Sequence, residues 1–482
     1  MTNMRQIDCA YLLGGRAVQN NQTIEIDGER IGAIRPGSRA STSRLLAIPA
    51  LVNAHDHGRP VRTSSIDAGG KPLEAWLQYL ALFPAVDPYL AAAVSLGNSA
   101  LGGAGIVMMH YTRVQGFTGL PEEVAEVARA AGDVGVRVGF AISMKDRNPI
   151  GYGPVEPLLD ALPQAARDEI VSRFVRPPLQ PKDYIKLVDD VAAAAHGPMF
   201  DVQYGPNGVQ WCSDALLQAV AEASHLSGRR VHMHLFETRY QRGYLDRLYK
   251  GDAVKFLDSI GLLSPRLTLA HCVWARPDEL ELLAERGVTI STNSSSNLKL
   301  RSGVAPVAKM LGCGCRVAMG IDGGALDDDD DMLRELRLTH LLHLGSGFTP
   351  KVNESDMLLL AAKTGRFSVT NSTEGGSIEA GAPADLLLLD YDALDDDNLR
   401  DNLDPVNLVF ARATARHIRE LIVAGRIVVK DRRVCGIDHD AARREVILRM
   451  KAGQPAMASF AAALPHLDHA IAAQMEGQFS CT

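Results

Sequence analysis

Two histidines separated by a single residue, His55 and His57, end an apolar run that starts at Ile48. Side chains alternate between the two faces of a β-strand, so both imidazoles point the same way at the end of this strand. Two adjacent imidazoles form half of a metal site. Because an isolated pair of this kind is more typical of a surface loop, the metal hypothesis needs support from elsewhere in the chain.

Three later segments supply that support, since each is an apolar strand with a polar residue at its carboxyl end. Residues 229–237 contain His232, His234 and Glu237, residues 267–271 end in His271, and residues 315–324 place Asp322 before two glycines. Parallel α/β barrels build their active sites at the carboxyl ends of their strands. Four such segments in one chain therefore predict one shared site.

The pattern between these segments predicts the elements that position them. Strand-like runs alternate with helical stretches such as residues 122–131, 214–227 and 278–286, which is typical of βα units around a parallel sheet. The eight candidate strands end near His57, His110, Ser143, Tyr204, His234, His271, Thr292 and Asp322. Eight strands in about 270 residues suit a (β/α)8 TIM-like barrel, which we assign to residues 49–377.

Both ends of the chain consist of short strand-like runs separated by glycine turns, for example residues 23–26 and 418–423. We expect residues 1–48 and 378–435 to join in one small β-sandwich domain that the barrel interrupts. Residues 436–482 are predicted to form a helical tail, which the sequence assigns only to packing or a subunit contact.

Composition excludes several classes of partner. The chain has 482 residues, 46% of them hydrophobic and 22% charged, which is typical of a globular protein. A net charge of −7 argues against nucleic acid or an anionic membrane as a partner. No apolar stretch approaches the roughly 20 residues that span a bilayer, and the N-terminus has no signal-peptide core. The seven cysteines are most simply free thiols, so we expect a cytoplasmic protein.

Three neutral imidazoles and one carboxylate make a site for Zn²⁺ or Fe²⁺ with room for water. We assign His55, His57, His234 and Asp322 as the ligands. A metal ion there would lower the pKa of its water from 15.7 to about 7 and so supply hydroxide at neutral pH.

The remaining polar residues of these segments could assist catalysis. Glu237 lies just past the strand that carries His234, where it could move a proton between hydroxide and substrate. His271 comes from the next strand and could hydrogen-bond the attacking oxygen. Asp322 could both bind metal and accept the proton of the hydroxide.

These parts, in this order, resemble the amidohydrolase superfamily, specifically its cytosine/guanine deaminase-like and chlorohydrolase-like branch. The resemblance covers nearly the whole chain. Four motifs carry it: residues 49–57 (PALVNAHDH), 296–306 (SNLKLRSGVAP), 320–324 (GIDGG) and 381–386 (GAPADL).

The resemblance implies a hydrolysis in which metal-bound hydroxide attacks an electron-poor ring or amide carbon. It also implies that His55, His57, His234 and Asp322 hold the metal while Glu237 and His271 assist. Binuclear members add a carboxylated lysine at the end of strand four, where residues 199–204 offer none. We therefore expect one divalent ion, with Zn²⁺ preferred and Fe or Mn as alternatives, and the family suggests a homodimer.

Some residues depart from the family or leave their roles open. Gly58-Arg59-Pro60 is not the sequence expected after the histidine pair of common nucleobase deaminases. Arg113, Lys145 and Arg147 follow strands two and three, where they could grip a carboxylate or another anionic group of the substrate. The alternative is that they form salt bridges to Asp146 or to the acidic run at residues 327–331.

Several single residues have two possible roles. His110 either contacts the substrate or packs at the barrel mouth, whereas His232 is interpreted as a buried neighbour of the ligands. Trp211 and Trp274 could stack on a flat ring or serve packing alone. The run at residues 327–331 is interpreted as a solvated helix start rather than a cation site.

The sequence thus predicts a metal-dependent aminohydrolase that releases ammonia from a small nitrogen heterocycle. If Arg113, Lys145 and Arg147 bind the substrate, the heterocycle is expected to carry a carboxylate or another anionic group. One alternative keeps the site but expels chloride, an amine or sulfide from a triazine-like or hydantoin-like ring, or opens a cyclic amide. A remote alternative is a non-catalytic scaffold, which has no need of ligands and a proton shuttle together.

Overall fold

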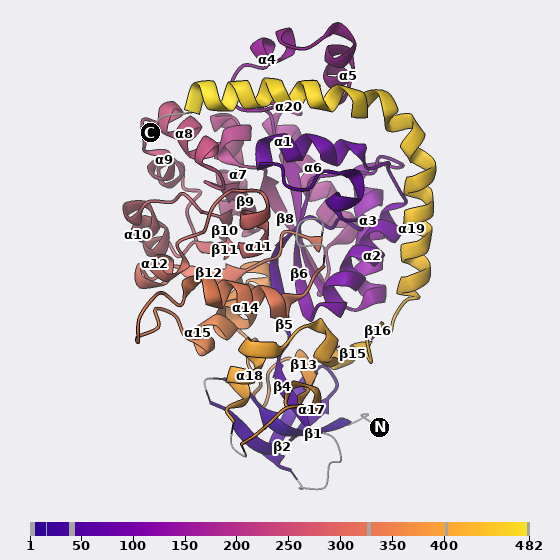
Figure 1. The fold of residues 1–482 in the computed structure, drawn as a ribbon, viewed down its shortest axis with the longest axis vertical. Coiled ribbons are helices and arrows are strands. Elements are labelled where there is room, and N and C mark those ends of the chain that lie inside the picture. The colour runs from indigo at the N-terminus through magenta and orange to yellow at the C-terminus, as the bar shows by residue number, and fades with distance from the viewer. Residues whose placement is uncertain (1–4, 16, 38–43, 325–328, 401–402, 480–482) are drawn as a thin grey trace.

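The computed structural model describes residues 5–15, 17–37, 44–324, 329–400 and 403–479. Its strands form two sheets of eight strands each. Figure 1 shows a large barrel surrounded by helices, with a smaller sheet below it and the last two helices wrapped around the barrel.

The larger sheet is entirely parallel and confirms the expected (β/α)8 barrel. Its strands follow one another in chain order, from β5 to β12, and the outermost two lie side by side so that the ring nearly closes. The strands are β5 (Leu51–Asp56), β6 (Ala104–Tyr111), β7 (Arg137–Met144), β8 (Phe200–Pro206), β9 (Val231–Leu235), β10 (Leu267–His271), β11 (Thr289–Thr292) and β12 (Arg316–Met319).

These strands are apolar along their whole length because both of their faces are covered. Every residue of β5, β6, β9 and β10 is buried, as expected where helices cover the outside and side chains fill the inside. The strands end within three residues of the predicted positions. The largest difference is at β12, which ends at Met319, so Asp322 lies in the turn that follows.

The helices alternate with the strands and cover the barrel. Those between β5 and β9 are α1 (Leu73–Tyr79), α2 (Pro88–Leu101), α3 (Leu120–Val134), α4 (Glu156–Asp160), α5 (Gln164–Phe174), α6 (Pro181–Ala195) and α7 (Asp214–Ser227). Those from β9 to the second sheet include α8 (Arg239–Leu248), α9 (Ala253–Ser259), α10 (Pro277–Glu285), α11 (Ser294–Lys299), α12 (Val307–Gly312), α14 (Met332–His343), α15 (Glu354–Leu359) and α16 (Gly365–Thr370). The Ser213 side chain caps α7 by accepting from Leu216 N, and Gly228 ends it at a φ of +73°.

The smaller sheet is mixed and joins the two ends of the chain, as predicted. Its order is β16-β15-β14-β13-β4-β1-β2-β3. The strands are β1 (Arg5–Leu12), β2 (Gln19–Asp27), β3 (Arg30–Pro36), β4 (Leu45–Pro49), β13 (Leu386–Asp390), β14 (Ile418–Val423), β15 (Arg426–Lys430) and β16 (Arg433–Val434). Pro49, the last residue of β4, pairs with Leu386, so one residue separates this sheet from the first barrel strand.

The C-terminal segment forms two helices, α19 (His439–Gly453) and α20 (Ala458–Phe479). Helix α20 lies across the barrel against α1, α5 and α8 (Figure 1). Its apolar residues, Phe460 and Leu464 among them, share a core cluster with Trp76 and Trp211. Among the described residues, no helix has both the length and the apolar character needed to cross a bilayer.

Candidate metal centre and active site

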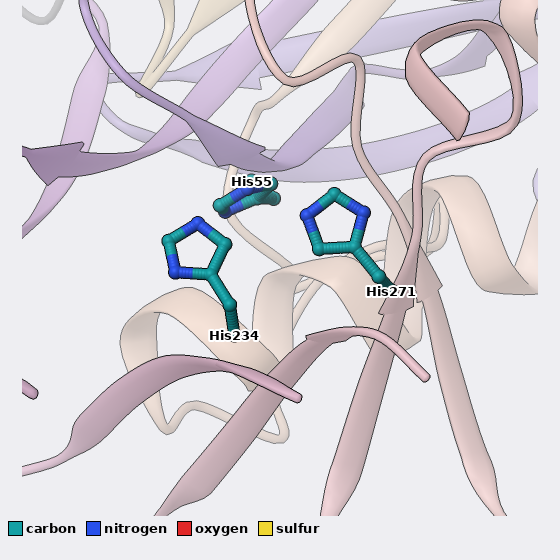
Figure 2. Close-up of side chains that lie close together, drawn as sticks. All are labelled: His55, His234 and His271. Carbon is teal, nitrogen blue, oxygen red and sulfur yellow. The ribbon is translucent and has the colours of Figure 1, made fainter. Parts of the chain in front are cut away.

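The candidate centre lies where three barrel strands end. His55 is next to last in β5, His234 is next to last in β9, and His271 is the last residue of β10. Figure 2 shows their three imidazoles facing one another across the end of the barrel. The nitrogens that they offer all lie within 4.8 Å of one another.

The turn after β12 brings Asp322 to the same point. Asp322 N donates to His55 O at 2.8 Å, and Ile321 N donates to the side chain of Asn53 at 2.9 Å. Gly320 permits this approach, because a Cβ atom there would lie 2.6 Å from His55 N. Asp322 Oδ1 consequently lies 3.3 Å from His55 Nε2 and 3.0 Å from His57 Nε2.

Hydrogen bonds on the far side of the rings fix which nitrogen faces the centre. His57 Nδ1 donates to His110 O at 2.8 Å, and His234 Nδ1 donates to Asn207 O at 2.5 Å. His271 Nδ1 donates to Asn297 Oδ1 at 2.8 Å. A proton held at Nδ1 leaves the Nε2 lone pair free to bind a metal or a polar hydrogen.

The electrostatics favour neutral imidazoles beside an anionic carboxylate. Burial lowers the pKa of His55 to about 3, although the charge of Asp322 opposes that change. Burial also lowers the pKa values of His234 and His271. Burial would raise the pKa of Asp322, but the imidazoles of His55 and His57 hold it well below its ordinary range.

Buried polar atoms without a hydrogen-bond partner indicate whether a metal ion fits this site. Within the described part of the chain, His55 Nε2, His271 Nε2 and Asp322 Oδ1 have no such partner. Unpaired polar atoms are rare in protein cores, because leaving them unpaired is costly. Imidazole nitrogens and a carboxylate oxygen at this spacing are the donor set of Zn²⁺, so these residues fit a divalent metal ion.

Glu237 faces this donor set from just beyond β9. Its side chain is buried, with Oε2 lying 3.7 Å from His271 Nε2 and Oε1 accepting from Ser302 Oγ at 3.4 Å. Burial raises the pKa of Glu237 well above its ordinary value, and the charges of Asp322 and Glu74 raise it further. These surroundings favour the protonated form of the carboxyl group, which is the form that can donate a proton.

A cavity of about 630 Å³ opens onto the centre. Its wall includes His57, His234, Glu237, His271 and Asp322, and also the aromatic residues Trp76, Tyr152 and Trp211. The volume suits a small organic ligand, and the aromatic faces suit a flat ring. Trp274, the other tryptophan considered for stacking, is partly exposed, donates to Ser302 O and does not line this cavity.

The three cations predicted near the substrate have partners in the protein. Arg113 and Lys145 line the cavity, but Arg113 donates to Leu80 O and Phe83 O, and Lys145 donates to Pro149 O. Arg147 does not line the cavity and pairs with Asp214 at 2.9 Å.

These contacts give no support to a carboxylate-bearing substrate. They also differ from the predicted alternative, because Arg147 pairs with Asp214 rather than with Asp146. Asp146 instead accepts hydrogen bonds from Ser213.

Two further histidines lie behind the centre. His110 and His232 are fully buried, their Nδ1 atoms are 3.2 Å apart, and neither lines the cavity. His232 is therefore a buried neighbour of the donor set, as interpreted from the sequence. His110 supports His57 through its backbone oxygen, so its placement favours packing over substrate contact.

Sequence reasoning gave no role to several residues of the cavity, among them Glu74 and Arg59. Glu74, on α1, accepts from Thr238 at 2.5 Å and from Tyr152 at 2.9 Å. Arg59 is buried and lies over the ring of Trp76. The only sequence signal for Arg59 was its place in the segment Gly58-Arg59-Pro60, which is not the sequence expected after the histidine pair.

The acidic run is described in part, because Asp327 and Asp328 lie outside the described residues. Asp331 caps α14 by accepting from Leu333 N and Arg334 N. This described end of the run is a helix start, as the sequence indicated.

The fold and the donor set together define the class of metal-dependent barrel hydrolases. Comparison with protein families narrows the class, because the amidohydrolase family model matches residues 46–428. The chain therefore belongs to the amidohydrolase family.

Two curated relatives extend over most of the chain. A 5'-deoxyadenosine deaminase of Methanopyrus kandleri is 29% identical over 391 residues, which cover 81% of this chain and 83% of the relative. A 5-methylthioadenosine/S-adenosylhomocysteine deaminase of Dictyoglomus thermophilum is 28% identical over 396 residues, which cover 82% of this chain and 84% of the relative. A zinc-bound adenosine deaminase from Xanthomonas campestris shares the fold, with a TM-score of 0.77, 22% identity, and coverage of 93% of this chain and 98% of the other.

Proposed function

We propose that the protein is a metal-dependent deaminase that removes the amino group of a purine nucleoside of the adenosine kind. The observation that carries the proposal is the cavity in which His57, His234 and Asp322 face Glu237. The names of the two curated relatives, both deaminases of adenosine nucleosides, support the substrate class. Trp76 and Trp211 on the cavity wall suit a flat purine ring.

His55, His57, His234 and Asp322 would hold one divalent ion, with Zn²⁺ the preferred metal for nitrogen and oxygen donors. When bound, such an ion acts as a Lewis acid and makes water nucleophilic at neutral pH.

The protein's own residues would then donate and accept the protons of the reaction. Glu237, whose raised pKa favours its protonated form, donates a proton to the ring nitrogen beside the reacting carbon and makes that carbon more electrophilic. His271 Nε2 accepts a hydrogen bond from the attacking water and orients it, because its Nδ1 proton is engaged by Asn297. The carboxylate of Asp322 accepts a proton from the same water.

In the second half of the reaction the tetrahedral carbon collapses. The carbon–nitrogen bond breaks as the proton held by Asp322 passes to the departing amino group. A carbon–oxygen double bond forms as the hydroxyl proton of the tetrahedral carbon returns to Glu237, which restores both carboxyl groups. The products are ammonia and the oxo form of the ring.

The proposal is tested by metal analysis together with an ammonia-release screen on the purified protein. The screen compares adenosine, 5'-deoxyadenosine and 5-methylthioadenosine with free purine bases and chlorinated triazines. We expect about one metal ion per chain and turnover of the nucleosides. Release of chloride from a triazine, or turnover of free bases alone, would replace this proposal with another reaction of the same site.

The absence of bound metal after purification with added zinc would contradict the site assignment itself. The homodimer and the domain boundaries at residues 48 and 377 stay predictions, to be checked by light scattering and limited proteolysis.

A further inference from the structure

We propose that Arg59 is a specificity-determining residue that donates hydrogen bonds to a lone-pair edge of the substrate ring, either ring nitrogens or a ring oxo group. The inference rests on the proposed function, because it names what the same cavity recognises. It concerns substrate binding and not the proton transfers assigned to Glu237, His271 and Asp322.

The first observation is that Arg59 is a buried charge without a polar partner. Arg59 is only 9% exposed, and its Nη1 atom is fully buried. Among the described residues, its side chain takes part in no hydrogen bond or ion pair. The guanidinium lies over Trp76, with Cζ 5.3 Å from the ring centroid. A cation–π contact offsets only part of the desolvation of a guanidinium and accepts none of its hydrogen bonds.

The other buried arginines show that this state is unusual in the described part of the molecule. Arg230 Nη1 donates to Asn371 at 2.9 Å, Arg242 pairs with Glu279 at 2.6 Å, and Arg366 pairs with Asp385. These residues hold the fold together through their partners. The contacts of Arg59 show no such stabilising role.

The second observation is the place of Arg59. It lies two residues after His57 and lines the cavity whose wall also contains His57 and Asp322. A ring bound beside His57 and Asp322 would therefore share the cavity with Arg59.

The carboxylates of Asp56 and Asp322 make hydrogen bonds with other groups and none with Arg59. Asp56 Oδ1 accepts from the backbone nitrogens of His57 and Gly58, and its Oδ2 accepts from Asn53. Asp322 is engaged by Ser296 and by the imidazoles of the centre.

The chemistry of the guanidinium indicates what it would bind. Its planar N–H donors match two adjacent acceptors, as when arginine contacts the oxygen and ring nitrogen at one edge of guanine. The ring of Trp76 lies against the guanidinium and would help to hold its plane. A purine has ring nitrogens at several edges and therefore offers the acceptors that Arg59 lacks.

The first test needs no substrate and compares melting temperatures of metal-loaded variants. Replacing a buried unpaired charge by an apolar side chain of similar length removes a cost, so Arg59→Met is expected to leave the melting temperature unchanged or to raise it by about 1–3 °C. Arg242→Met, which breaks the pair with Glu279, is expected to lower it. A fall for Arg59→Met as large as that for Arg242→Met would show a structural role and overturn the proposal.

The second test compares wild type and Arg59→Met with ligands that differ in their hydrogen-bond acceptors. With adenosine as substrate, Arg59→Met is expected to raise KM by about 10–100-fold and to change kcat by less than about threefold, because it loses charged hydrogen bonds made in the ground state. Inhibition constants are then measured for the 3-deaza and 7-deaza nucleosides and for the 2-oxo nucleoside. The ligand that lacks the contacted acceptor should bind wild type and Arg59→Met equally.

Arg167→Met is the matched control, since Arg167 is exposed and pairs with Asp160 at the surface. It should leave KM and melting temperature unchanged. An equal loss of affinity for every ligand in the Arg59→Met variant would overturn the proposal.

Failure of the proposed function looks different from failure of this inference. If wild type acts on no purine, the proposed function fails, while the melting comparison and the KM of Arg59→Met on the ring identified by the screen still decide the role of Arg59.

Discussion

Glu237 is a single carboxyl group that faces the candidate metal centre from a buried position, 3.7 Å from His271 Nε2. Burial raises its pKa well above the ordinary value, which favours the protonated form that the proposed role as a proton donor requires. Its proposed role in proton transfer can be separated from any role in holding the metal, because the proposed ligands are His55, His57, His234 and Asp322.

Glu237→Gln is therefore expected to lower kcat by about 10²–10⁴-fold while leaving the metal content unchanged, since the amide keeps the shape but cannot transfer a proton. Ammonia release and metal analysis on the same preparation measure both quantities. Glu285→Gln, which changes an exposed carboxylate, is the control. Activity of Glu237→Gln within tenfold of wild type would remove Glu237 from the mechanism.

Gly320 is a position at which added side-chain volume would press on the candidate centre. A Cβ there would lie 2.6 Å from His55 N and 2.7 Å from Asn293 Oδ1, and the first of these atoms belongs to the backbone and cannot move aside. We expect Gly320→Ala to cost about 1–3 kcal/mol of stability and to weaken metal binding, because it pushes Asp322 away from His55.

Denaturant unfolding and metal titration measure the two effects of Gly320→Ala. Gly312→Ala is the matched control in the preceding helix, where a Cβ meets no atom within 4 Å. That control should be neutral or slightly stabilising. Equal behaviour of the two variants would show that the close approach at Gly320 does not matter.

At the scale of elements, helix α14 carries a buried carboxyl group against the helix that follows β11. Glu335 accepts from Ser295 N at 3.1 Å and is buried. Burial raises its pKa from 4.5 to about 7, although hydrogen bonds from Ser295 and Ser294 oppose the change. The folded state therefore prefers the protonated form.

This preference makes the contribution of α14 depend on pH. Below pH 4.5 the group is protonated in both states and costs nothing. As pH rises from 4.5 to about 7 the unfolded state loses its proton first, so stability falls, by about 3 kcal/mol at most, and stays constant above that range. Glu335→Gln should lack this fall, as urea unfolding at a series of pH values would measure. Parallel pH profiles for wild type and Glu335→Gln would contradict the prediction.

At the scale of the whole molecule, the candidate metal centre joins residues from strands that are far apart in the chain. His55, His234 and Asp322 belong to the first, fifth and eighth barrel strands or their following turns. A ligand that binds only the folded state stabilises it, by about 4 kcal/mol when present at 1,000 times its dissociation constant.

Removal of metal by a chelator is therefore expected to lower the melting temperature by several degrees and to abolish activity, with recovery of both when Zn²⁺ is restored. Calorimetric scans of the chelated and reloaded protein measure the change. The Asp322→Asn variant serves as the control, because its melting temperature should respond less to the chelator. An unchanged melting temperature in the chelated wild type would show that the centre holds no ion in the folded protein.

Much of the candidate site could be predicted from sequence because barrel strands place chemistry at their carboxyl ends. Period-two alternation and apolar runs located His55, His57, His234 and His271 correctly at strand ends. The cation assignment was less successful. Arg113, Lys145 and Arg147 follow strands as expected, but their long side chains reach backbone carbonyls or Asp214 instead of a ligand.

The sequence by itself determined the barrel, the joining of the two chain ends in one sheet, and the position of the candidate ligands at strand ends, because these depend on local patterns and on the fixed geometry of parallel strands. Only the tertiary structure decided which side chains line the cavity and which have partners elsewhere. Arg59, Glu74 and Trp76 acquired their surroundings from α1 folding over the barrel end and from α20 packing against it. Such contacts join residues far apart in the chain, and no local pattern records them.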